Sequence, residues 1–523
     1  MTSLFDPRRS GRSALTVAVL LLSSLALLPV LALVVFAAFG QGEGRLALGV
    51  AGGLQLTTTL VLLLSVGVLG AALGTANGWI STSCHFPGVR WLRIAQLLPL
   101  ATPAYLLAAT AIDLGSRVSW QIHGPLWAIA ALTLTTYPYV FLLSSESFAI
   151  SGRRQLEACR SLGVGPWGSF RRVALPMALP AIGAGIALSG MEVMNELGAV
   201  ELLGVPTLSS GILQRWQNDG DPQGAAALAL VALVIVTLLV AAERGLRRRS
   251  RRWLIGGGGD GQPCWSLRGW RAVLAVLLTA VPPACGLGLP LLWAVLSLDQ
   301  LDAEPAGDLL LLGARSLGLA LLAAGLTVVV ALVLTISRRW LNQPLLQRLN
   351  FVAGMGYAIP GTVLALALML LGGPWQLSPL LLLMWGYVDR FLAVAKGGLD
   401  AALEHIPPSL DEAATGLGCR WPQVSVRLHL PLLRGPLLGG ALLVFVDVVK
   451  ELPLTFALRP FDFDTLSVRV YQYASDERLG AALLPALLIL LLGLAASLAL
   501  VPGLSQAARG ADSTREGASL SPD

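Results

Sequence analysis

The chain has 523 residues, of which 55% are hydrophobic and 13% are charged, and its mean hydropathy is +0.73. Because soluble globular domains carry about 25% charged residues, this composition excludes a soluble protein and indicates an integral membrane protein. The formal net charge of +6 does not indicate nucleic-acid binding, because the arginines are spread among short loops where membrane topology alone accounts for them.

Apolar segments long enough to cross a hydrocarbon core, which takes about 20 helical residues, recur along the whole chain. We expect an all-α membrane protein with about 12 transmembrane helices. The first segment lacks a small-residue cleavage site and is followed almost at once by another, so we interpret it as a retained helix and not as a signal peptide. In chain order the expected helices cover residues 14–38, 56–80, 91–113, 125–147, 175–197, 223–242, 271–297, 309–337, 350–373, 377–399, 431–452 and 481–502.

Basic residues predict which loops face the cytoplasm. They lie before the first expected helix and after the second, fourth, sixth and eighth, and the densest run, RGLRRRSRRW, starts at Arg244. The intervening loops are acidic, as in the NDGD segment around Asp219. Because cytoplasmic loops carry an excess of lysine and arginine, we expect a multi-pass protein of the cell inner membrane with both termini in the cytoplasm.

One polar stretch occurs twice, as EACRSLGVGPWGSFRRVALP from Glu157 and as EAATGLGCRWPQVSVRLHLP from Glu412, 255 residues later. Self-similarity on this scale indicates two copies of one domain, and an even number of helices per copy gives both the same orientation. We therefore expect two parallel six-helix repeats. The expected parts are a first transmembrane domain at 1–243, a basic, glycine-rich cytoplasmic linker at 244–265, a second transmembrane domain at 266–504 and a polar tail at 505–523.

Each copy of the stretch predicts two short helices separated by a glycine turn, because Gly163 or Gly418 suits the left-handed position that ends a helix. In the second copy, the SLDE segment from Ser409 also fits a capping box, so one alternative is that Glu412 only caps its helix. The pattern EAxxxLG, with Leu-Pro twelve residues after the glycine, resembles the EAA loop of importer-type ATP-binding-cassette (ABC) permeases.

This resemblance implies a type I importer permease fold whose two loops each insert a short coupling helix into an ATP-hydrolysing subunit. The implied partners are two copies of that subunit, an extracytoplasmic solute-binding protein and membrane lipid. The chain has no GxxxxGK[ST] phosphate loop, so we expect no catalytic residue and no bound cofactor here, with ATP used by the partner subunit. The implied coupling residues are Glu157, Ala158, Gly163, Glu412, Ala413 and Gly418.

Two charged clusters follow the Leu-Pro pairs, in MEVMNELG and VDVVKELP, and also repeat at 255 residues. Their spacing places each cluster on one helical face near the outer end of a helix. We hypothesise an outer gate or a cation-attracting ring, and the alternative is interfacial ion pairing, such as Asp447 with Lys450. Two prolines with small neighbours are expected to kink helices along the same path, although membrane helices also tolerate structural prolines. The pathway candidates are Glu192, Asn195, Glu196, Asp447, Lys450, Glu451, Pro103 and Pro360.

The segments from Glu196, Tyr357 and Lys450 resemble the fused two-domain permeases of ferric-iron importers. That resemblance implies Fe(III) as the cargo, delivered by an external binding protein; thiamine, sulfate, molybdate or polyamines are alternatives within the same architecture. The cysteines and histidines show no metal-binding spacing, and no metal ligand is assigned. An ion-coupled secondary transporter is the alternative from another class, because it too can have six plus six helices.

Overall fold

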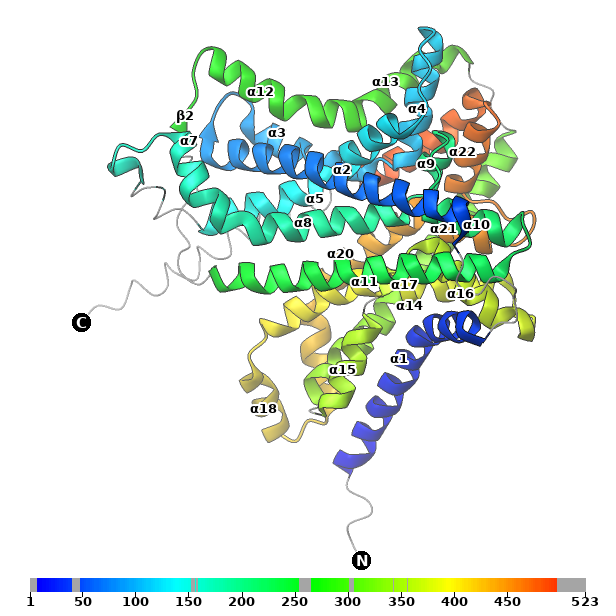
Figure 1. Ribbon diagram of the computed structural model, residues 1–523. Helices are drawn as coiled ribbons and strands as arrows, with labels where there is room; N and C mark the ends of the chain where they lie inside the picture. Colours follow the sequence, from blue (N-terminus) through cyan, green and yellow to red (C-terminus); the bar gives the residue numbers. More distant parts are fainter. Residues whose placement is uncertain are drawn as a thin grey trace, which may run out of the picture. The chain divides into compact units, whose positions relative to one another are not determined.

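The computed structural model describes residues 7–39, 48–151, 156, 159–253, 265–300, 305–341, 343–354 and 356–495, and nearly all of them are helical (Figure 1). The first-half helices are α1 (Pro7–Phe39), α2 (Gly49–Ser83), α3 (Val89–Ala95), α4 (Ala104–Arg117), α5 (Pro125–Ser151), α7 (Pro166–Ser169), α8 (Leu175–Asn195), α9 (Gly198–Leu202), α10 (Leu208–Gln217) and α11 (Pro222–Trp253). The second-half helices are α12 (Trp270–Pro283), α13 (Leu289–Leu296), α14 (Ala306–Trp340), α15 (Pro344–Ala353), α16 (Gly361–Gly372), α17 (Pro379–Glu404), α18 (Pro408–Gly416), α19 (Trp421–Val424), α20 (Leu430–Lys450), α21 (Pro453–Leu458) and α22 (Leu466–Ser475).

Within these described ranges, two short strands pair in parallel, β1 (Cys84–His85) with β2 (Trp265–Ser266). Three π-helical turns, Phe170–Ala174, Ala284–Gly288 and Ser425–His429, continue directly into α8, α13 and α20. A last apolar helix covers Leu479–Ala495.

Eight helices in the described part of the chain are long and apolar enough to cross a membrane, and each overlaps one of the expected spans. The expected span 91–113 is instead broken: Val89–Ala101 and Ala104–Arg117 meet at a bend of 93° and would make a ninth span only together. The expected span 350–373 is also divided, between α15 and α16. The expected all-α membrane fold is thus confirmed: the described residues contain eight helices of spanning length, with shorter or broken apolar helices between them.

The two remaining expected spans differ for separate reasons. The expected span 377–399 corresponds to α17, which is long enough to cross but carries Asp389, Arg390 and Lys396. The last expected span, 481–502, is represented by the shorter helix Leu479–Ala495, and its remaining residues lie outside the described ranges.

The sequence repeat is matched by a repeat of helix boundaries. Helices α8 and α20 each have 21 residues, begin 255 residues apart and follow a five-residue π-helical turn. Helices α2 and α14 each have 35 residues. Because a π-helical turn is rare and needs a local insertion in the helix, its presence at matching places supports duplication of the domain.

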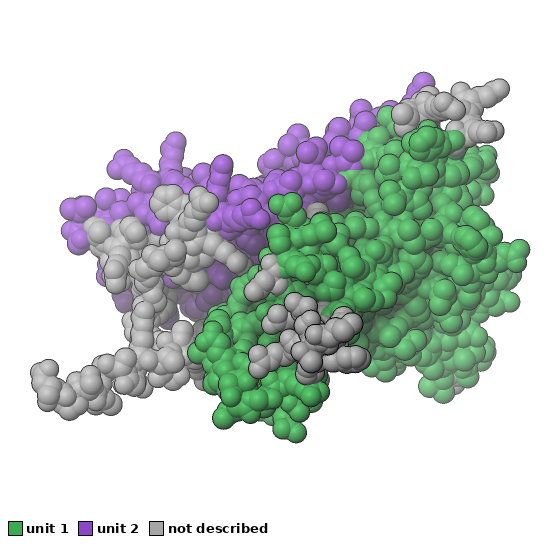
Figure 2. Space-filling view, turned by 90° about the horizontal axis from the view of Figure 1, so that it is seen from below, with its two compact units in different colours: residues 1–48, 212–233, 304–469 green, residues 49–211, 234–303, 470–523 purple. Residues whose placement is uncertain are grey.

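The chain forms two compact units, and both take segments from each half of the sequence (Figure 2). One unit contains residues 1–48, 212–233 and 304–469, and the other contains 49–211, 234–303 and 470–523. The boundaries of the duplicated domains stay a prediction. The compact units are defined by contacts in space, and each combines segments from both halves of the sequence, so they do not test those boundaries.

Each unit is built around the same three helices of the repeat. In the unit that contains residues 49–211, α2, α5 and α8 pack on one another. In the unit that contains residues 304–469, which we call the first unit and the other the second, α14, α17 and α20 do the same. Glycine allows the close approach in the second unit: a Cβ added at Gly74 or Gly185 would lie 2.7 Å from atoms of Val140 on α5. Small residues at such contacts are typical of membrane helices, whose association depends on tight packing.

Candidate coupling loops and pathway residues

The second repeated loop has the predicted geometry of two short helices joined by a glycine turn. Helix α18 ends at Gly416, Gly418 has a left-handed φ of +86°, and α19 then leads through a π-helical turn into α20. Glu412 and Ala413 are both exposed on α18. Glycine is favoured at this position by its left-handed backbone conformation. Crowding is not the reason, because no atom lies within 4 Å of the place where a Cβ would be.

The expected capping box at Ser409 is wrong. Helix α18 begins at Pro408 after Pro407, and no side chain caps its first turn. Proline suits the first helical position because its fixed φ matches the helix and its missing N–H would be unpaired there. A side-chain cap instead precedes α19, where the Gln423 side-chain oxygen accepts the Arg420 backbone N–H at 2.9 Å.

The first repeated loop shares the glycine turn and the second short helix. Gly163 has a φ of +75°, and α7 continues through the π-helical turn into α8. Glu157 and Ala158 lie outside the described residues. The matching left-handed glycines confirm that the two loops share their turn geometry.

The duplicated glutamates of the pathway candidates each bind the start of the next short helix. Glu196 follows α8 and accepts the backbone N–H of Ala199 at 2.8 Å, and Glu451 follows α20 and accepts that of Leu454 at 2.9 Å. Both residues have an extended backbone, with φ and ψ of −73° and 130° at Glu196 and −68° and 125° at Glu451. Because the first N–H groups of a helix lack partners within it, both carboxylates act as caps.

The other four polar residues of the two clusters have different surroundings in each half. The Tyr139 hydroxyl donates to Glu192 at 3.1 Å, and Asp447 pairs with Lys450 at 2.8 Å. Asn195 is half-buried at the end of α8. The alternative of an Asp447–Lys450 ion pair thus agrees with the geometry, while the hypothesis of a gate or ring stays a prediction.

The two candidate prolines mark breaks and not kinks. Pro103 immediately precedes α4 and Pro360 immediately precedes α16, both with an extended backbone. A proline cannot donate a backbone hydrogen bond, so the start of a helix tolerates it better than the interior does. The expectation that these prolines bend continuous helices is therefore corrected: each lies where a new helix begins.

The chain is similar to known transport proteins. A family model described as "binding-protein-dependent transport system inner membrane component" matches residues 5–252. The Fe(3+)-transport system permease protein FbpB 2 of Haemophilus influenzae is 26% identical over 83% of this chain and 87% of its own length. The chain thus carries the domain of this family in residues 5–252 and resembles an ABC importer permease over both of its halves. It is thus a multi-pass inner-membrane transport subunit.

Other relatives of the permease match a smaller part of it. The sulfate permease CysT of Escherichia coli is 29% identical over 38% of this chain and 77% of its own length. The molybdenum permease ModB of the same organism is 26% identical over 34% of this chain and 86% of its own length.

Two exposed leucines lie beside the glycine turns of the permease and were not among the predicted coupling residues. The side chains of Leu162 and Leu417 are 80% and 86% exposed, and each directly precedes a left-handed glycine. The signal was present, because both leucines belong to the repeated EAxxxLG pattern. An apolar side chain held at the tip of a polar loop at both copies is typical of a surface that a partner covers.

A buried polar network beside Glu451 could not be found from the sequence. The Tyr387 and Thr455 hydroxyls lie 2.6 Å apart, and the Thr455 hydroxyl donates to Glu451 at 2.6 Å. These residues come from α17, α21 and the end of α20, and all three are buried. In the first half the position 255 residues before Thr455 is the buried, apolar Val200, so no repeated pattern points to the network.

Proposed function

We propose that this permease translocates Fe(III), which an extracytoplasmic binding protein delivers, and that two copies of a separate ATPase subunit drive it. In this proposal each ATPase copy docks on one repeated loop, at Glu157–Gly163 and at Glu412–Gly418. Both loops and both termini face the cytoplasm, in keeping with the arginines beside them. The permease itself binds no cofactor, and ATP is used only by the partner.

The shape of the loops supports a docking role. Each has a short helix after a left-handed glycine, and each exposes a leucine beside that glycine. A leucine side chain exposed to water gains about 25 cal/mol for each Å² of apolar surface that a partner covers. Two such loops on one chain give one docking place for each ATPase copy.

The extent of similarity supports iron as the cargo. The Haemophilus Fe(3+) permease matches 83% of the chain and therefore both copies of the domain, whereas the sulfate and molybdenum permeases match 38% and 34%. Fe(III) is a hard cation that prefers oxygen ligands, and carboxylates such as those of Glu192 and Asp447 would attract it. Thiamine, sulfate, molybdate or another small solute remain the alternatives within the same architecture.

Uptake by proteoliposomes tests the proposal. The permease would be purified with its ATPase, reconstituted with ATP inside the vesicles, and supplied from outside with the binding protein loaded with ferric iron, sulfate, molybdate or thiamine. We expect iron uptake that stops when ATP is replaced by a non-hydrolysable analogue. Uptake of another solute but not of iron would contradict the choice of cargo.

An ion-coupled mechanism gives a different result in the same vesicles. A secondary transporter would take up its solute under a proton gradient without ATP and without a copurifying ATPase. Uptake under those conditions would contradict the whole proposal.

A further inference from the structure

Three charged or polar side chains fix the second coupling loop, Asp411–His429, to the end of α14. Asp411 is the second residue before Ala413 on α18, and its carboxylate has a different partner at each oxygen. Arg339 donates from Nε to one oxygen at 2.6 Å, and His429 donates from Nε2 to the other at 2.7 Å. Arg339 also donates to the backbone carbonyl of Ile406 at 2.9 Å, just before α18.

All three residues of this network are shielded from water. The side chains of Arg339 and Asp411 are 17% and 12% exposed, and that of His429 is fully buried. Charge-assisted hydrogen bonds in such surroundings are stronger and more directional than contacts between apolar groups. The network therefore joins α18, the last turn of α14 and the π-helical turn before α20 into one set of contacts.

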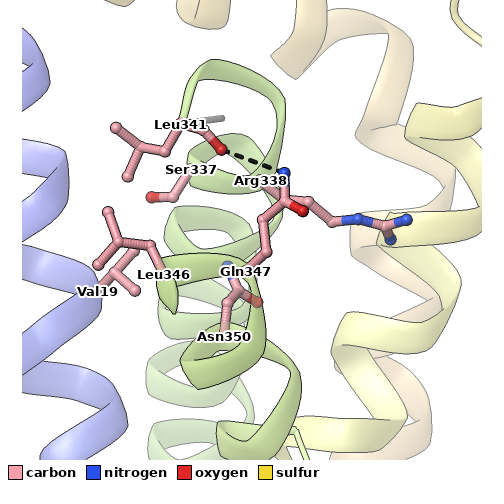
Figure 3. Close-up of a pocket in the computed structure, with 7 residues that line it drawn as sticks. All are labelled: Val19, Ser337, Arg338, Leu341, Leu346, Gln347 and Asn350. Carbon is pink, nitrogen blue, oxygen red and sulfur yellow. Dashed lines mark hydrogen bonds between the residues drawn. The ribbon is translucent and has the colours of Figure 1, made fainter. Parts of the chain in front are cut away.

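The neighbouring arginine on α14 has a separate role. Figure 3 shows Arg338 extending away from Val19 and Leu346, which line the small pocket beside this end of α14. Its guanidinium pairs with Glu404 at 2.9 Å and with Asp400 at 3.5 Å, both on α17. Arg339 therefore forms an ion pair with the coupling loop, at Asp411, whereas the ion pairs of Arg338 are with α17.

In the first coupling loop, the two positions that match Asp411 and His429 are apolar. Leu156 and Ala174 lie 255 residues before Asp411 and His429, and both belong to one buried apolar cluster with Trp79, Val140 and Phe148. The Trp79 ring also lies 5.2 Å from that of Phe170 in the π-helical turn. Apolar packing is not directional, so it allows small sliding movements that a buried ion pair resists.

We propose that Arg339, Asp411 and His429 are positioning residues that lock the second coupling loop to α14 and α20, whereas the matching positions of the first loop, Leu156 and Ala174, are held by apolar packing. The two coupling loops are then mechanically unequal. Motion of the ATPase on the second loop passes directly to α14 and α20, and motion on the first loop is partly absorbed by its apolar contacts. This last consequence rests on the proposed function, while the lock itself does not.

Two natural cysteines allow both loops to be compared in one molecule. Cys159 and Cys419 lie in the first and the second loop, and both are half-exposed. The full-length permease would keep only these two cysteines, with Cys84, Cys264 and Cys285 replaced, and the rate of maleimide labelling would be measured at each. This readout needs no ATPase, so its result does not depend on the proposed function.

The test variant is Asp411→Asn, which keeps the shape of the side chain and removes its charge. We expect Cys419 to be labelled about tenfold faster and Cys159 to change by less than about twofold, because only the second loop opens locally. The matched control is Glu404→Gln, which removes a carboxylate from the exposed Arg338 pair at the same end of α14. It should leave both labelling rates unchanged.

A second variant avoids leaving a buried charge alone. Asp411→Leu and His429→Ala install the residues of the first loop, and Arg339→Thr removes the remaining charge. We expect the same selective acceleration at Cys419. An unchanged rate at Cys419 in both variants would overturn the lock, and equal acceleration at both cysteines would overturn its local character.

The unequal use of the loops has its own measurement in the reconstituted importer. We expect Asp411→Asn to lower the amount of solute moved per ATP about tenfold, while ATPase binding and ATP turnover persist. If the wild-type permease needs no ATPase, the proposed function fails and the lock is still judged by labelling. If the wild type is ATP-driven and the variant moves as much solute per ATP, the lock plays no part in coupling.

Discussion

The Glu451 carboxylate accepts the backbone N–H of Leu454 at 2.9 Å, which places the end of α20 directly on the start of α21. Its second oxygen accepts the backbone N–H of Thr455, also at 2.9 Å. Glu196 makes the corresponding contact with Ala199 in the other half. The duplicated glutamate therefore has a structural role in both halves, and a gating role must be tested separately from it.

Glutamine at both positions separates these roles. In Glu196→Gln the side-chain oxygen can still accept the Ala199 N–H, so we expect a loss of stability within about 1 kcal/mol. In Glu451→Gln the amide NH2 replaces one of two accepting oxygens, so we expect a larger loss of about 1–3 kcal/mol. If the carboxylates also attract a cation, uptake should fall about tenfold or more because the charge is absent. Thermal unfolding and uptake would be measured on the same preparations.

The control for this pair is replacement by alanine, which removes the cap and the charge together. Glu196→Ala with Glu451→Ala should lower both the unfolding temperature and uptake. Normal uptake by the glutamine variant, with ATP turnover intact, would reject the gate and leave capping as the role of these residues.

The left-handed glycines give a prediction about the coupling loops. Gly163→Val and Gly418→Val force a β-branched residue to a positive φ, which costs about 1–2 kcal/mol or more and favours another turn geometry. We expect each variant to lose most of its copurifying ATPase while the permease remains folded. Copurification and the unfolding temperature are the two measurements.

Nearby glycines provide matched controls for these substitutions. Gly165 and Gly416 lie within two residues of the left-handed positions, neither has a positive φ, and both have open space where a Cβ would lie. Gly165→Ala and Gly416→Ala should therefore retain the ATPase. Loss of the ATPase in the alanine variants as well would show that the loops tolerate no change, and the backbone explanation would be wrong.

Local signals predicted the coupling loops better than the helices around them. The glycine turn at Gly418 follows from short-range backbone chemistry, and the structure confirms it. The start of α18 was missed because two consecutive prolines, Pro407 and Pro408, begin the helix in place of the expected Ser409. Hydropathy likewise predicted continuous spans across Pro103 and Pro360, although a new helix begins directly after each of these prolines. Hydropathy averaged over a window of residues does not register that a proline lacks the backbone N–H that a continuous helix needs.

Contacts between distant residues could not be predicted from the chain alone. Tyr387 and Thr455 are 68 residues apart in sequence, and Arg339 and Asp411 are 72 apart. The repeat gives no hint of either contact, because the residues 255 positions before Thr455 and Asp411 are the apolar Val200 and Leu156. The repeat therefore predicted the shared backbone and could not predict the chemistry that the second half has added to it.

The exposed leucines provide a test of docking that does not disturb the backbone. Leu162→Ser and Leu417→Ser change side chains that are 80% and 86% exposed, so the stability of the permease should change by less than about 0.5 kcal/mol. We expect ATPase binding to weaken about tenfold for each variant, because an apolar contact in the interface is lost. Titration of the purified permease with the ATPase measures the change.

Phe461 is the control for exposed apolar residues outside the loops. Its side chain is 98% exposed between α21 and α22, and Phe461→Ser should leave ATPase binding unchanged. Equal weakening by all three serine variants would mean that exposed apolar surface in general binds the ATPase, which contradicts docking at the two loops.

The Tyr387–Thr455 contact predicts a stability effect that is separate from coupling. Tyr387→Phe removes a buried hydroxyl that lies 2.6 Å from the Thr455 hydroxyl, and the Thr455 hydroxyl still donates to Glu451. We expect the variant to lose about 1 kcal/mol of stability, the usual net value of one hydrogen bond, with normal ATPase binding. Thr455→Val should cost more, about 2 kcal/mol, because it leaves both the Tyr387 hydroxyl and one Glu451 oxygen with fewer partners in a buried place. Thermal unfolding of the two variants would reveal this order, and a Thr455→Val protein as stable as Tyr387→Phe would show that Thr455 does not link the other two side chains.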